Sequence, residues 1–144
     1  MSKVRKGSHT TSWLTMHLIF VTKYRYKVLK GEIEKRCRDL MKQDCGALEI
    51  RILKGVVSYD HVHIHIEYPP GLSVSEICKQ LKRRSTTKMQ KEYLQLKKKY
   101  CEKRFWSRGY GAFSTGNITD EMVQQYIEGH RKNPNDKNDN FFLD

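Results

Sequence analysis

The stretch His61-Val-His-Ile-His-Ile-Glu-Tyr68 decides the fold, because polar and apolar residues alternate along it without interruption. Strict alternation with a period of two is typical of a β-strand that buries one face. Its histidines then share one side of the strand, and its valine and isoleucines point into a core. Pro69-Pro70-Gly71 ends the strand. The chain therefore has a strand that presents three imidazoles on one side of a sheet.

Segments on both sides of this strand carry patterns of their own. Runs rich in β-branched and aromatic residues predict three more strands. Apolar residues at helical spacing predict three helices, and Ser73 and Thr119 stand where good N-cap residues are needed. The predicted strands cover 13–22, 48–57 and 105–115, and the predicted helices cover 31–42, 73–100 with a break at 85–87, and the segment after Thr119.

The predicted order of elements is β-α-β-β-α-β-α, which indicates an α+β domain of the ferredoxin-like, or RRM-like, kind. Such a domain has a four-stranded antiparallel sheet with helices on one face. The last helix is an addition to this plan, and it carries Tyr126. We expect the opposite face of the sheet to be free to present the histidines.

The distribution of charge is as informative as its sum. The chain has 144 residues and a formal net charge of +12, which predicts a polyanionic partner: nucleic acid first, an anionic membrane second. Residues 1–30 hold seven Lys and Arg and no acid, and residues 79–108 hold twelve against two acids. The other two segments are mildly acidic and contain the histidine strand and Tyr126. Basic binding surfaces are therefore expected to flank a site of another kind.

Length and cysteine usage predict a single cytoplasmic domain. We expect one domain over residues 1–144, with a basic tail at 1–12 and a mobile tail at 133–144. No apolar run approaches the ~18 residues of a membrane span, and the start lacks the apolar region of a secretory signal. The cysteines lack C-x-x-C spacing and are expected to be free thiols in a reducing compartment. They are Cys37, Cys45, Cys78 and Cys101.

His61 and His63 are the strongest candidates for chemistry, because alternate strand residues lie ~6–7 Å apart on one face and two imidazoles can converge on one divalent cation. Tyr126 and His130 share a face of the last helix, which places a candidate nucleophile one turn from a candidate third ligand. A metal ion there would stabilise the charge that develops on a phosphodiester. Zinc hydrolysis, a polar strand face without metal and a tyrosine in the core are the alternatives.

A family resemblance rests on these same residues. Asp60-His-Val-His63, followed by Pro69-Pro70, resembles the D-H-V-H…P-P signature of the small single-tyrosine HUH transposases, from insertion sequences of the 200/605 class. The similarity covers nearly the whole chain. Further stretches that resemble the family are His17–Leu29, Phe105–Tyr110, Ser114–Ile118 and Tyr126–Glu128.

The resemblance implies an enzyme that cuts and rejoins single-stranded DNA at transposon ends, with no small-molecule cofactor. His61 and His63 would be ligands of Mg²⁺ or Mn²⁺, and Tyr126 would form a 5′-phosphotyrosine and leave a free 3′-hydroxyl. The family works as a homodimer with composite active sites and recognises DNA hairpins. Two residues depart from its pattern: His130, a candidate third ligand, stands where an amide is usual, and His65 stands where an apolar residue is usual.

The basic segments then become candidate DNA-binding surfaces. Lys23 and Arg25, beside two tyrosines, are expected to hold an unpaired strand by charge and stacking. Other basic residues are expected to contact the phosphates of a hairpin stem. They are Lys82, Arg83, Arg84 and Lys88.

Two other functions remain as alternatives. The same chemistry serves a domesticated HUH nuclease or a replication initiator that acts on hairpins, although a two-tyrosine initiator needs a second tyrosine where this chain has His130. A ferredoxin-like sheet is also used by non-catalytic modules that bind nucleic acid. Such a module needs exposed aromatic residues on its free face, where this chain has histidines.

Overall fold

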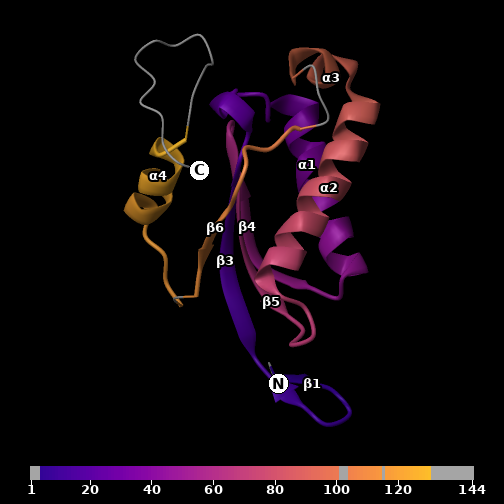
Figure 1. Ribbon diagram of the computed structural model, residues 1–144, viewed down its shortest axis with the longest axis vertical. Helices are drawn as coiled ribbons and strands as arrows, with labels where there is room; N and C mark the ends of the chain where they lie inside the picture. The colour runs from indigo at the N-terminus through magenta and orange to yellow at the C-terminus, as the bar shows by residue number, and fades with distance from the viewer. Residues whose placement is uncertain (1–3, 101–103, 115, 131–144) are drawn as a thin grey trace.

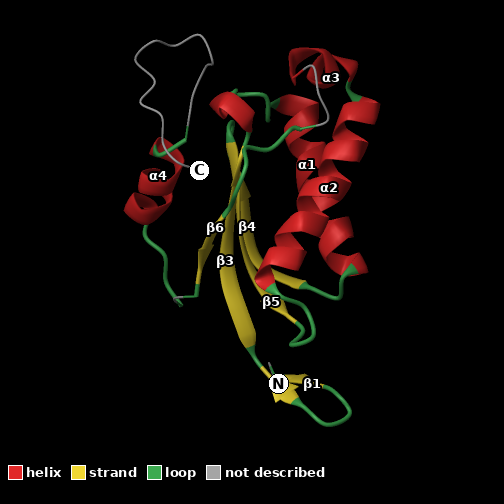
Figure 2. Cartoon of the chain, in the orientation of Figure 1, coloured by secondary structure: helices red, strands yellow, loops and turns green. Residues whose placement is uncertain are grey.

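The computed structural model describes residues 4–100, 104–114 and 116–130, and its centre is a four-stranded antiparallel sheet. The strands lie in the order β4 (Arg51–Val57), β5 (His61–Tyr68), β3 (Leu14–Val21) and β6 (Gly111–Phe113). All neighbouring pairs are antiparallel, and Figure 2 shows the strands together at the centre of the molecule. The predicted ferredoxin-like arrangement is confirmed, and β5 has the bounds that its alternation predicts.

Helices cover both faces of this sheet, but unequally. The two long helices α1 (Gly31–Ala47) and α2 (Val74–Glu92) lie together on one face, with the short α3 (Leu94–Tyr100) after them (Figure 1). The last helix, α4 (Asp120–Glu128), lies on the other side of the sheet. The expectation of a free second face is therefore wrong in part, because α4 covers some of it.

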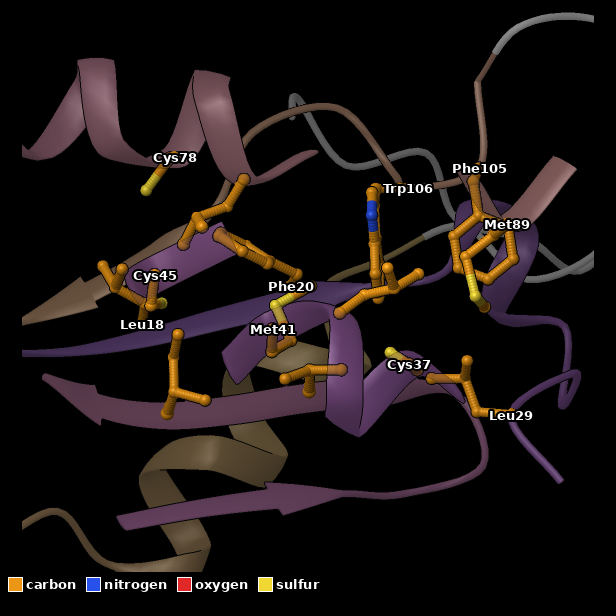
Figure 3. Close-up of a cluster of buried hydrophobic side chains, with 14 of the residues drawn as sticks. Leu18, Phe20, Leu29, Cys37, Met41, Cys45, Cys78, Met89, Phe105 and Trp106 are labelled. Carbon is orange, nitrogen blue, oxygen red and sulfur yellow. The ribbon is translucent and has the colours of Figure 1, made fainter. Parts of the chain in front are cut away.

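The main core lies between the sheet and the α1–α2 layer. Leu18 and Phe20 of β3 point into it, as do Val62, Ile64 and Ile66 of β5. They meet apolar side chains of the two helices there, among them the thiols of three described cysteines (Figure 3). Cys37, Cys45 and Cys78 are free and buried, and burial raises the pKa of each thiol to about 12. Cys101 lies outside the described residues.

Both predicted N-caps are present in the structure. The Ser73 hydroxyl accepts the backbone N–H of Glu76 at the start of α2, and the Thr119 hydroxyl accepts that of Met122 at the start of α4. Each cap satisfies one of the donors that a helix leaves unpaired at its first turn.

The break predicted at 85–87 is wrong, because α2 runs through these residues to Glu92. The Ser85 hydroxyl donates to the Leu81 carbonyl at 2.7 Å, so it bonds back along the helix and does not compete with it. Ser85 also accepts the indole N–H of Trp106 at 2.8 Å, and this bond anchors the segment around Trp106 to α2. The chain changes direction at Tyr93, before α3 begins.

The predicted strand at 105–115 is shorter in the structure, where β6 spans only Gly111–Phe113. Phe105 and Trp106 are buried in the main core, and Trp106 forms one isolated bridge to Thr22, just past the end of β3. Packing of two large aromatic residues into the helical side draws this segment away from a regular strand.

The N-terminal segment contains a hairpin where a tail was expected. β1 (Arg5–Lys6) pairs with β2 (Thr11–Ser12). The Arg5 guanidinium donates to both carboxylate oxygens of Glu67 at 2.8 Å, and the Glu67 side chain is fully buried. This ion pair attaches the hairpin to the end of β5. The segment 133–144 lies outside the described residues. No helix among the described residues is long and apolar enough to span a membrane.

Candidate active site

The candidate site lies on the sheet face that α4 partly covers. Because Val62, Ile64 and Ile66 point into the main core, the alternate residues His61, His63 and His65 lie on the opposite face. They are half-buried. The predicted placement of these three side chains follows directly from the alternation of the strand.

The second side of the site is α4, which a small apolar cluster holds against the sheet. Ile127 packs there with Ile19 and Val21 of β3, and all three are almost fully buried. In the sheet register, Val21 lies opposite His61, and Ile19 lies opposite His63. The residues that anchor α4 are thus the cross-strand neighbours of the two candidate ligands.

Tyr126 is half-buried and packs in the same cluster. Its ring lies over Gly111, where an added side-chain carbon would come within 3.3 Å of both Tyr126 Cδ2 and Ile19 Cβ. Ile19 pairs with Gly111 on one side and with His63 on the other. Two strand spacings, or ~10 Å, therefore separate the strand position beneath Tyr126 from that of His63.

His61 has a carboxylate partner that fixes its ring. Its Nδ1 lies 2.9 Å from Asp60 Oδ1, which leaves the lone pair of a neutral ring on Nε2. The hydrogen bond from His61 is the main cause that lowers the pKa of Asp60, and the nearby guanidinium of Arg25 lowers it further. Arg25 Nε lies 3.8 Å from Asp60 Oδ2. This is the pattern by which a carboxylate orients a metal-binding histidine.

Arg25 reaches Asp60 from a strained turn. In η1 (Lys23–Arg25), Tyr24 and Arg25 have φ values of 63° and 56°, in the left-handed region that side chains rarely adopt. The Thr22 hydroxyl donates to the Tyr26 carbonyl at 2.7 Å and so holds the turn closed. Arg25, predicted as a DNA contact, is thus engaged within the protein.

His63 is kept neutral by its surroundings. Burial is the main cause that lowers its pKa to about 4, and the neighbouring His17, His61 and His65 act in the same direction. A neutral imidazole is the form that binds metal ions. His63 Nε2 lies 3.1 Å from Nδ1 of His17, a β3 residue that is only 6 % exposed.

The donor set at this strand fits a divalent cation. His61 and His63 offer two imidazole nitrogens on one strand face; His63 is held neutral, and His61 is oriented by a carboxylate. Within the described part of the chain, no group of three or more His, Cys, Asp or Glu side chains is arranged to hold a metal. Nitrogen ligands favour Mn²⁺ over the harder Mg²⁺.

His130 lies just past the end of α4 and is 6 % exposed. Its Nδ1 donates to the Tyr126 carbonyl at 2.9 Å, and its ring packs edge-on against the Tyr126 ring with centroids 4.6 Å apart. These contacts attach His130 to the tyrosine. Its role as third ligand stays a prediction.

Two of the basic residues predicted to bind DNA also make contacts within the fold, and their role toward DNA stays a prediction. Lys82 is half-buried beside the loop at 107–109, and its ammonium donates to the carbonyls of Ser107 and Gly109. Burial lowers its pKa to about 8. Lys88 pairs at 2.8 Å with Asp44, whose carboxylate is buried. Lys82 therefore attaches the 107–109 loop to α2, and Lys88 attaches α2 to α1.

A surface recess of about 460 Å³ beside α2 is lined by Lys82 and by three arginines. Arg83, Arg104 and Arg108 are exposed at its edge, although Arg83 also donates to the Gln80 side chain at 2.6 Å. Arg84, by contrast, is half-buried. Lys23 lies over the Tyr24 ring, 5.2 Å from its centroid. The clustering of Arg104 and Arg108 with Arg83 depends on the packing of the 105–109 loop onto α2, which no local pattern in the sequence indicates.

A ferredoxin-like sheet with a histidine pair on one face and a tyrosine-bearing helix laid over it defines the class of small DNA-processing proteins that the sequence indicated. Residues 10–130 match the family model described as "Transposase IS200 like". The chain belongs to the IS200-like transposase family, and it is a transposase of this kind.

Individual relatives agree with this assignment. The chain is 32% identical over 128 residues to the transposase for insertion sequence element IS200 of Salmonella typhimurium, covering 89% of this chain and 84% of that protein. It is 29% identical over 126 residues to the ISDra2 transposase TnpA of Deinococcus radiodurans, covering 88% and 90%.

Two solved structures resemble the chain. A Deinococcus radiodurans protein assigned as a transposase superimposes with a TM-score of 0.83 at 26% identity, covering 90% of this chain and 99% of that one. A REP-associated tyrosine transposase bound to a REP hairpin superimposes with a TM-score of 0.52 at 14% identity, covering 90% and 70%. The second likeness shows the fold alone.

Proposed function

We propose that this transposase cuts and rejoins single-stranded DNA through a covalent bond between DNA and Tyr126. The phenol gives up its proton and its oxygen attacks a backbone phosphorus, the bond from phosphorus to the 3′ oxygen breaks, and that oxygen takes up a proton and leaves as a 3′-hydroxyl. The 5′ phosphate stays on the tyrosine as an ester. Attack by a 3′-hydroxyl on this ester reverses the step and reseals a strand without ATP.

His61 and His63 would hold a divalent cation, Mg²⁺ or Mn²⁺, beside the phosphate. Such an ion supplies positive charge where negative charge develops in the transition state. Asp60 keeps His61 in the tautomer whose Nε2 lone pair faces a ligand, and Arg25 supports Asp60 from behind. His130 positions the end of α4 through its bond to the Tyr126 carbonyl, and it is our candidate third ligand.

Single-stranded DNA with hairpin ends is the proposed substrate. The exposed arginines Arg83, Arg104 and Arg108 form a basic recess suited to the phosphates of a stem. The hairpin bound by the REP-associated structural neighbour supports this choice. We further propose that two copies assemble into a homodimer with composite sites, in which α4 of one copy serves the histidine strand of the other.

One observation carries the proposal: α4 is packed on the same sheet face that bears His61 and His63, through contacts with their cross-strand neighbours. A non-catalytic nucleic-acid module would instead leave this face open and present aromatic residues on it. A domesticated nuclease or a replication initiator would use the same arrangement. The DNA around the gene separates these cases, since imperfect palindromes just inside both ends of an element indicate a transposon.

The test uses single-stranded oligonucleotides that carry such a palindrome and a fluorescent label at the 3′ end. The fragment downstream of the cut stays on the protein, so we expect a labelled band that survives denaturing electrophoresis. Duplex DNA or EDTA should abolish the band.

Tyr126→Phe should also abolish the labelled band, whereas Tyr59→Phe, a change at an exposed tyrosine, should leave it intact. An adduct with Tyr126→Phe would exclude the proposed nucleophile. An adduct of normal yield in EDTA would exclude the metal.

A further inference from the structure

His17 is a buried polar residue that no step above uses. It lies in the middle of β3, where its register partners are His65 on one side and Phe113 on the other. Its ring stacks on that of His65, with centroids 3.9 Å apart and planes 7° from parallel. Both of its nitrogens have polar neighbours: Nδ1 lies 3.1 Å from His63 Nε2, and Nε2 lies 3.4 Å from the Gly116 carbonyl.

For two neutral rings, these two contacts determine which nitrogen of each ring carries the hydrogen. A carbonyl oxygen only accepts, so the Nε2 of His17 must carry the hydrogen. Its Nδ1 must then accept, and His63 must donate from Nε2. The lone pair of His63 is left on Nδ1. His63 thus has one nitrogen engaged and one free for a ligand, which is the state that Asp60 produces in His61.

The Gly116 contact extends this arrangement toward the tyrosine. Residues 116–118 lead directly into Thr119, the N-cap of α4. Together with His17, His63 and His65 they line a recess of about 350 Å³ on the same sheet face. His17 therefore touches a candidate metal ligand with one nitrogen and the segment that leads into the tyrosine helix with the other.

We infer that His17 is a positioning residue, which orients His63 for the metal ion and ties it to the segment before α4. This inference rests on the proposed function, because it assigns His17 a role toward the proposed metal site. It predicts that the two nitrogens of His17 have separable tasks. Loss of the Nδ1 acceptor should weaken metal binding, and loss of the Nε2 donor should loosen residues 116–118.

Two amide substitutions separate the tasks. In His17→Asn the short side chain keeps an acceptor near the position of Nδ1 but does not reach Gly116. In His17→Gln the longer side chain keeps a donor near the position of Nε2 but has no group where Nδ1 was. Binding of Mn²⁺ alone to the full chain is measured by calorimetry and by electron paramagnetic resonance, and hydrogen exchange reports the amides at 116–118.

We expect His17→Gln to lose about tenfold or more in Mn²⁺ affinity, with normal exchange at 116–118. His17→Asn should bind Mn²⁺ within about threefold of the native chain and exchange faster at 116–118. If both variants bind Mn²⁺ equally, or if exchange changes alike in both, His17 only fills space and the inference is wrong.

His61→Ala serves as the reference for the metal site itself. If His61→Ala binds Mn²⁺ as tightly as the native chain, the proposed metal site fails, whatever His17 does. If His61→Ala loses affinity and His17→Gln does not, only the role of His17 is overturned.

Discussion

Gly111→Ala offers a sharp test of the position of Tyr126, because this glycine lies directly beneath the tyrosine ring. An added Cβ would lie 3.3 Å from three atoms: Ile19 Cβ, Phe113 Cε2 and Tyr126 Cδ2. Favourable carbon contacts lie at ~3.5–4.0 Å, so the neighbours must recede by a few tenths of an ångström. Ile19 and Phe113 belong to paired strands, whereas Tyr126 belongs to a nine-residue helix held by a small cluster. We therefore expect α4, and Tyr126 with it, to shift away from the sheet.

The magnitude follows from this geometry. Overpacking of a methyl group in a tight site costs ~1–3 kcal/mol, and the low end applies because α4 is able to move. Displacement of a reacting group by 1 Å costs ~100-fold in rate, so a few tenths of an ångström should cost roughly three- to tenfold. Gly111→Ala should therefore lose more in cleavage rate than its modest loss of stability explains.

The assay measures the single-turnover rate of adduct formation on a hairpin oligonucleotide, together with urea unfolding of each variant. Gly46→Ala is the matched control, since Gly46 lies inside α1 with nothing within 4 Å of an added Cβ. It should gain up to ~1 kcal/mol of stability and cleave at the native rate. A native cleavage rate in well-folded Gly111→Ala would refute the packing of Tyr126 on Gly111.

Three further predictions concern stability and metal choice. The pKa of His63 is about 4 in the folded chain, below its ordinary value of 6.5. Between these two pH values the unfolded chain binds more protons than the folded chain, so the free energy of unfolding should fall as the pH drops from 6.5 to 4. The expected loss is ~1–2 kcal/mol, because His63 is partly exposed. Urea unfolding across this range should show the slope, and His63→Gln should flatten it. Lys88→Met should cost ~1–3 kcal/mol in urea unfolding by leaving the buried Asp44 carboxylate without its ion pair, yet leave the salt dependence of DNA binding unchanged. A steeply altered salt dependence would instead make Lys88 a DNA contact. In adduct assays, Mn²⁺ should reach half-maximal effect at least ~10-fold below Mg²⁺, and the reverse order would argue against two nitrogen ligands.

The sequence predicts the elements whose signals are local. The alternation at 61–68 gives β5 and the face of its histidines, and the caps at Ser73 and Thr119 give the starts of two helices. Structural features that depend on contacts with distant residues cannot be predicted in this way. Ser85 looks like a helix breaker until its contacts with Leu81 and Trp106 are known.

The same limit applies to the site. His61, His63 and Tyr126 stand out by type and spacing, but the role of His17 depends on the register between β3 and β5, which the sequence does not determine. The internal contacts of Lys82 and Lys88 also depend on distant partners: Lys82 contacts the 107–109 loop, and Lys88 pairs with Asp44. Charge counts locate basic segments but do not say which ammonium groups face solvent.

The most direct measurement of the central claim is the chemical identity of the residue that holds the DNA. The adduct formed on a hairpin oligonucleotide is trimmed with nuclease and digested with trypsin, and the modified peptide is sequenced by mass spectrometry. The peptide spanning residues 109–131 contains both Tyr110 and Tyr126, so fragment ions must distinguish them. We predict a nucleotide phosphate on Tyr126 alone. A nucleotide on Tyr110 or on any other residue would contradict the account.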